Sequence, residues 1–125
     1  MADIRIMVVD DEEHIGFLLK AKLEREGYVV HWYLNGHDAL EHVHEINPHL
    51  IVTDVMLPGL TGMEVLERLQ ADDALRDIPV IMLSGLGKEE DIVKGIEMGA
   101  ADYMVKPFRP AELVARVKRL LARQG

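Results

Sequence analysis

The 125-residue sequence contains no cysteine, which excludes disulfide bonds and thiolate metal sites. It also lacks any apolar run approaching the roughly 20 residues of a membrane-spanning helix, and its start turns acidic too soon for a signal peptide. Basic residues are scarce: 14 lysines and arginines stand against 22 acidic residues, for a net charge of −8. That balance argues against a nucleic-acid-binding surface, which needs clustered basic side chains. These absences predict a single cytoplasmic domain over residues 1–125 that binds neither membrane nor nucleic acid.

Two periodicities alternate along the chain. Apolar runs of strand length occur at 4–9, 29–33, 50–53, 79–83 and 102–105. Helical patterns fill the gaps: the first ends at Gly27, the second before Pro48, the third begins near Gly62, the fourth covers 89–98 and the last begins at Pro110. Strands that are apolar on both faces indicate a parallel sheet covered by helices on both sides. The expected fold is therefore α/β, a doubly wound five-stranded parallel sheet of order 2-1-3-4-5 with flavodoxin-like (βα)5 topology.

Polar side chains follow four of the five predicted strands. They are Asp10 and Asp11 after the first strand, Asp54 after the third, Ser84 after the fourth and Lys106 after the fifth. Ligands of such sheets bind outside the carboxyl ends of the strands, so these side chains are expected to converge there. A plainer interpretation of the acidic run 10–13 is a solvated first turn of a helix, where acids are favoured. Asp54 and Lys106 decide against that interpretation.

The expected cluster suggests its own chemistry. Crowded carboxylates repel, so either one of them takes a proton or a cation lies among them. Oxygen ligands without cysteine or a well-placed histidine favour Mg²⁺ over a transition metal. The Lys106 ammonium and the Ser84 hydroxyl, together with the metal, would then contact the oxygens of a phosphoryl group. Asp54, on the middle strand, is the candidate nucleophile, and its carboxylate would form an acyl phosphate.

Four motifs carry a resemblance to a known family: VVDDEE, TDVMLPGLTG, IMLSG and GAADYMVKPF. In this order and at these spacings they resemble the receiver domain of two-component response regulators, over residues 4–123. The motifs VMLPG and KPFRPAELVARVK are most similar to receivers that control winged-helix transcription factors. The resemblance implies a phosphorylation switch that is chemically an enzyme only on itself. Its partner would be a sensor histidine kinase or a phosphotransfer protein.

The resemblance also implies roles for single residues at the metal site. Asp54 accepts the phosphoryl group from the partner's phosphohistidine. Asp11 and Asp54 bind Mg²⁺ directly, the backbone carbonyl of Met56 is a third protein ligand, and Asp10 helps through water.

Further implied roles concern the phosphoryl group and the switch. Ser84 and Lys106 bind phosphoryl oxygens, and the bond between Lys106 and Pro107 is expected to be cis. Tyr103 is the expected switch residue, whose ring turns inward when Ser84 moves toward the phosphoryl group.

The output surface implied by the resemblance comprises the helix over 89–98, the strand over 102–105 and the last helix. Its candidate residues are Ile92, Glu97, Asp102, Glu112, Arg116 and Lys118. Ile92 departs from the family, which usually has a basic residue there to pair with the acid at Glu112. A homodimer that phosphorylation strengthens is expected to form through this surface.

Two alternatives from other classes are weaker. A phosphohydrolase with an aspartyl-phosphate intermediate usually needs a second acid two residues after the nucleophile, and that position is Met56. A flavin-binding module of the same fold would need a Ser/Thr- and Gly-rich loop after the first strand. The acidic run 10–13 would repel the flavin's phosphate there.

Overall fold

A computed structural model describes residues 3–85 and 87–123 of the chain. Five parallel strands form one sheet of order β2-β1-β3-β4-β5, as the sequence predicted. The strands are β1 (Arg5–Val9), β2 (Val29–Tyr33), β3 (Leu50–Asp54), β4 (Val80–Ser84) and β5 (Asp102–Val105). The third and fourth strands each end one residue later than predicted. Asp54 and Ser84 are therefore the last residues of their strands.

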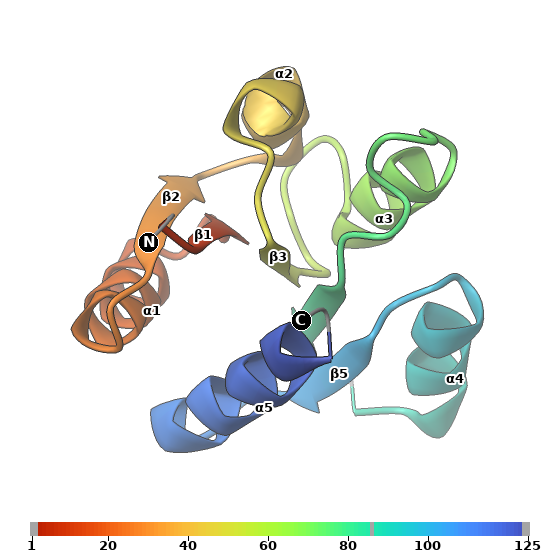
Figure 1. The fold of residues 1–125 in the computed structure, drawn as a ribbon. Coiled ribbons are helices and arrows are strands. Elements are labelled where there is room, and N and C mark those ends of the chain that lie inside the picture. Colours follow the sequence, from red (N-terminus) through yellow and green to blue (C-terminus); the bar gives the residue numbers. More distant parts are fainter. Residues whose placement is uncertain (1–2, 86, 124–125) are drawn as a thin grey trace.

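Helices cover both faces of the sheet (Figure 1). They are α1 (Glu13–Arg25), α2 (Gly36–Ile46), α3 (Gly62–Gln70), α4 (Glu89–Glu97) and α5 (Pro110–Ala122). One buried cluster joins one face of the sheet to α1 and α5, and a second joins the other face to α2 and α3, with α4 at its margin. Alternation along β1 supplies both clusters, because Ile6 and Val8 belong to the first cluster and Met7 and Val9 to the second. This confirms the doubly wound α/β class.

Some helices begin with a side-chain cap that is recognisable in the sequence, and others do not. Thr61 caps α3 in a capping box with Glu64, and Asn35 caps α2 by accepting the N–H of Asp38. Arg109 precedes α5 without a side-chain cap, and Pro110 takes the first turn, where its missing N–H costs nothing. Within 3–85 and 87–123, no helix is both long and apolar enough to cross a membrane.

Candidate functional site

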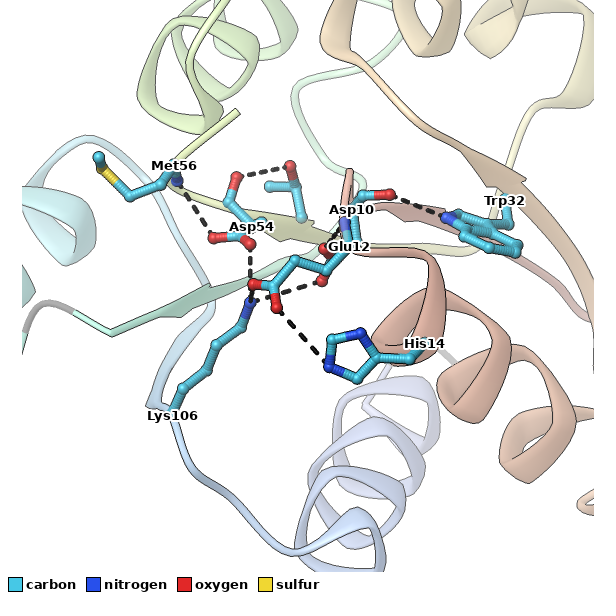
Figure 2. A network of polar contacts seen from close by, with 8 residues as sticks. Asp10, Glu12, His14, Trp32, Asp54, Met56 and Lys106 are labelled. Atoms are coloured by element: carbon cyan, nitrogen blue, oxygen red, sulfur yellow. Dashed lines mark hydrogen bonds and ion pairs between the residues drawn. The ribbon is translucent and has the colours of Figure 1, made fainter. Parts of the chain in front are cut away.

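Three of the polar residues predicted to converge, Asp10, Asp54 and Lys106, meet at the carboxyl edge of the sheet (Figure 2). Asp54 and Ser84 end β3 and β4, and Asp10 and Lys106 directly follow β1 and β5. Parallel strands all present their carboxyl ends at one edge, so side chains distant in sequence become neighbours there.

Asp54 lies at the centre of this edge with only 3% of its surface exposed. Its Oδ2 accepts a hydrogen bond from Lys106 Nζ at 2.7 Å, and its Oδ1 accepts one from the backbone N–H of Met56 at 3.1 Å. The Met56 side chain is itself 62% exposed and offers no acidic group. The carboxylate of Asp54 is therefore held by one donor on each oxygen.

Lys106 sits among three carboxylates. Besides Asp54, its Nζ lies 3.1 Å from Glu12 Oε1 and 3.6 Å from Asp10 Oδ2. Burial acts to lower the pKa of the ammonium, but the hydrogen bond to Asp54 and the charges of Asp10 and Asp54 outweigh it and raise the pKa. The lysine thus stays charged at neutral pH. The bond between Lys106 and Pro107 is cis, as predicted.

Asp10 is fully buried, at 0% exposure. Its Oδ1 accepts the backbone N–H of Glu12 at 2.9 Å, whereas its Oδ2 has no hydrogen-bond partner. Desolvation is the largest influence on this carboxyl and raises its pKa against the opposing effects of the Glu12 N–H and Lys106. A buried carboxylate oxygen without a donor suits a cation, so the residues present fit the Mg²⁺ ion that the sequence suggested.

The carboxylates that gather differ by one from the predicted set. One oxygen each from Asp10, Glu12 and Asp54 lie within 4.8 Å of one another. Asp11 is exposed and does not belong to this group, so its role as a metal ligand stays a prediction. The sequence shows Glu12 only as one acid of the run 10–13, and the order of residues in that run does not indicate which side chain points toward Asp54.

The two predicted switch residues are both buried. Ser84 is 0% exposed, and its carbonyl oxygen accepts the backbone N–H of Lys106 at 2.7 Å. Tyr103 is only 7% exposed, and its ring lies against α4 at Gly95, where an added Cβ would come within 3.1 Å of it. The ring is thus buried against α4 in this structure. The roles of Ser84 and Tyr103 as a switch stay predictions.

Four charged residues of the predicted output surface are paired within the chain: Asp102, Glu112, Arg116 and Lys118. Arg116 donates to Asp102 at 2.7 Å and to Glu112 at 2.9 Å, and Arg119 donates to Asp102 at 3.0 Å. The hydrogen bond to Asp102 is the main reason that the pKa of Arg116 is raised. Arg119 was missed because a helical pattern does not say how far a long side chain reaches across to a strand.

Three other residues of this surface lie as follows. Lys118 pairs with Glu26, just past the end of α1, at 2.6 Å, and this hydrogen bond raises the pKa of the lysine. Ile92 is half-buried against the core, and Glu97 is exposed. The exposed apolar side chains of α4 are instead Val93 and Ile96.

Comparison with known proteins agrees with this geometry. A family described as the response regulator receiver domain matches residues 6–118. The solved receiver domain of a Francisella response regulator superposes with a TM-score of 0.93 at 33% identity, covering 98% of this chain and 100% of that one.

Two curated relatives are transcriptional regulators. The alkaline phosphatase synthesis regulatory protein PhoP of Bacillus subtilis is 48% identical over 119 residues, which are 95% of this chain and 49% of that protein. The phosphate regulon regulatory protein PhoB of Rhizobium meliloti is 44% identical over 119 residues, or 95% and 52% of the two chains. This chain therefore spans about half the length of these relatives.

Proposed function

The chain belongs to the family of response regulator receiver domains, and from this premise we propose that it is a phosphorylation-activated switch whose phosphoacceptor is Asp54. Receivers of this family serve two-component signalling. The phosphoryl donor is a histidine kinase or a phosphotransfer protein, and the domain is an enzyme only on itself.

One observation carries this proposal. The Asp54 carboxylate is buried at the end of the central strand, and an ammonium lies 2.7 Å from one of its oxygens beside two further acidic groups. A carboxylate held this way has one orientation to offer a phosphorus atom, which lowers the entropic part of the barrier. Once the phosphoryl group is attached to Asp54, the Lys106 ammonium can pair with its oxygens instead.

Phosphoryl transfer to Asp54 is a displacement at phosphorus. An oxygen of the Asp54 carboxylate forms a bond to the phosphorus of the donor's phosphohistidine, and the bond between phosphorus and the imidazole nitrogen breaks. The imidazole, which carries a proton on its other ring nitrogen, leaves with the bonding electron pair as the neutral side chain of histidine. The product on this chain is an aspartyl phosphate, whose oxygens Lys106 and Ser84 then bind.

A Mg²⁺ ion fits the acidic end of the site. Asp10, Asp11, Asp54 and the carbonyl of Met56 are the proposed ligands or water-mediated contacts, and Glu12 joins them because its carboxylate lies in the same cluster. When bound, the ion offsets the repulsion between these carboxylates and the incoming phosphoryl group. The three clustered carboxylates outnumber the single ammonium of Lys106, which favours a divalent cation.

The consequence of phosphorylation is a change on the surface formed by α4, β5 and α5, through Ser84 and Tyr103. We expect the domain to act in the cytoplasm, to have no nucleic-acid contact of its own and to form a homodimer when phosphorylated. The exposed thioether of Met56 supports this switch over a phosphohydrolase, because it supplies no second acid beside Asp54.

Incubation with Mg²⁺ and acetyl phosphate tests the acceptor. Wild-type protein should gain the mass of one phosphoryl group, stable in acid and labile in base, and Asp54→Asn should gain none because an amide is no nucleophile. Asp77→Asn removes an exposed carboxylate elsewhere and is the matched control, which should label as wild type does. Equal labelling of Asp54→Asn and wild type would refute the assignment.

A further inference from the structure

We propose that Trp32, on the edge strand β2, is a positioning residue that holds the acidic end of β1 in the geometry that Mg²⁺ needs. The inference deepens the proposed function and rests on it. Trp32 does not touch the clustered carboxylates itself; it acts through the backbone of Asp10.

Trp32 and its neighbour hold both backbone groups of Asp10. The indole N–H of Trp32 donates to the carbonyl of Asp10 at 3.0 Å (Figure 2). The N–H of Asp10 donates to the carbonyl of Tyr33 at 3.1 Å. The second bond continues the sheet ladder, which any residue at position 33 could provide. The first requires a side-chain donor of this length on the edge strand.

The Asp10 carbonyl lies where the chain leaves the sheet. Beyond it no strand fixes the backbone, yet Asp10 and Glu12 must both present carboxylates to one point. The hydrogen bond that the Glu12 N–H donates to Asp10 Oδ1 ties the two residues together, but it does not tie them to the sheet. The ladder bond to Tyr33 holds only the N–H of Asp10, whereas the indole holds its carbonyl, on the side from which Glu12 follows. The indole thus limits how far the pair can rotate away from Asp54 and Lys106.

A matching small residue on α1 makes room for the indole. At Gly16 an added Cβ would overlap the indole ring, including the nitrogen that donates to Asp10. The ring is half-buried in the cluster beneath α1. Gly16→Ala therefore offers a second way to disturb the bond, and it leaves the tryptophan in the chain.

The test measures Mg²⁺ affinity by calorimetric titration of the whole chain, with thermal unfolding in chelator recorded for each variant. Trp32→Phe keeps an aromatic ring but deletes the donor, so the affinity should fall roughly three- to tenfold, as expected for one lost hydrogen bond. Gly16→Ala should give a fall of similar size, and the double variant should be no worse than either single one. Tyr33→Phe, which deletes a polar group from the next residue of the same strand, should bind as wild type.

A second readout uses the wild-type protein alone. Trp32 is the only tryptophan of the chain, so its indole N–H gives a single side-chain signal of that kind in a ¹H–¹⁵N spectrum. That signal should shift with Mg²⁺ and saturate together with the backbone signal of Glu12. If the variants do not fold, the response of the indole signal to Mg²⁺ tests the role of Trp32 by itself.

Each outcome bears on the proposal. A Trp32→Phe protein that binds Mg²⁺ like wild type, whatever its melting temperature, would reduce Trp32 to packing and overturn this inference alone. An indole signal indifferent to Mg²⁺ would do the same. Failure of the wild type to bind Mg²⁺ would overturn both this inference and the metal part of the proposed function. If the wild type binds Mg²⁺ in a Trp32-dependent way but gains no phosphoryl group from acetyl phosphate, only the assignment of Asp54 as phosphoacceptor is overturned.

Discussion

At the scale of single residues, the buried charge that prepares the site for a cation also destabilises the metal-free protein. Asp10 is buried with one oxygen unpartnered, and Lys106 stands too far from that oxygen, at 3.6 Å, to give it a strong hydrogen bond. An uncompensated buried carboxylate costs folding free energy. The same oxygen is what a cation can use, so the cost and the function have one origin.

We expect Asp10→Asn to stabilise the metal-free protein at neutral pH. Because the pKa of Asp10 is raised in the folded state, losing its proton costs stability as the pH rises through the interval between its ordinary and its raised value. The substitution removes a buried charge without a donor on one oxygen, so the melting temperature in chelator should rise by about 3–5 °C, which corresponds to about 1 kcal/mol in a domain of this size. The gain should shrink as the pH is lowered through the acidic range.

Differential scanning calorimetry at neutral and at acidic pH, both in chelator, measures this effect. The exposed Asp77→Asn is again the control and should change the melting temperature little. Mg²⁺ should stabilise the wild type more than Asp10→Asn. A lower melting temperature for Asp10→Asn at neutral pH would contradict the argument.

At the scale of elements, ion pairs join β5 to α5. Asp102 at the start of β5 receives Arg116 and Arg119 from α5, and its Oδ1 also accepts the N–H of Tyr103. Lys118, by contrast, ties α5 to the residue after α1 through Glu26. The same helix thus carries two sets of ion pairs, and only the first belongs to the surface expected to change on phosphorylation.

Asp102→Asn should loosen α5 from β5 without removing the hydrogen bond to Tyr103, because the amide keeps a carbonyl oxygen. We expect urea denaturation to show a loss of about 1 kcal/mol, since these are charge-assisted bonds in partly exposed positions. The loss should diminish in high salt. Glu97→Gln, an exposed position on α4, is the control; equal effects from the two variants would show that the network contributes nothing.

At the scale of the whole molecule, the surface of α4, β5 and α5 combines internally paired charges with exposed Val93 and Ile96. A homodimer through it would exchange some pairs within the chain for pairs between chains and would bury the apolar side chains. The net free energy of dimer formation is therefore small in the unphosphorylated protein. Phosphorylation can then shift the equilibrium between monomer and dimer, as a switch requires.

Sedimentation velocity with and without beryllofluoride and Mg²⁺ tests the dimer. The protein should associate when beryllofluoride is added, and Ile96→Glu should weaken the association by roughly tenfold or more, since a buried charge at an interface is costly. Phe17→Glu changes an exposed apolar residue on α1 and should leave the association unchanged. A wild type that stays monomeric at high concentration would indicate that another protein binds this surface.

Periodicity alone predicted the fold, because burial of strands on both faces and of one stripe on each helix leaves its pattern in local sequence. The predicted strand ends also brought Asp10, Asp54 and Lys106 together, whereas Asp11, predicted with them, is exposed. Asp10, Asp54, Ser84 and Lys106 each sit at a strand end, and parallel strands share one edge whatever the details of packing. Both conclusions needed only the local apolar pattern and the position at which each strand ends.

What packing decided were the directions of long side chains. Glu12 rather than Asp11 turns toward Lys106, a partner 94 residues away in the chain, and no local pattern distinguishes the two acids. Trp32 reaches Asp10 only because Gly16 leaves room for its ring, and Arg119 reaches Asp102 only because α5 lies along β5. Such contacts depend on the placement of whole elements to within an ångström or two, because a hydrogen bond is lost over that distance.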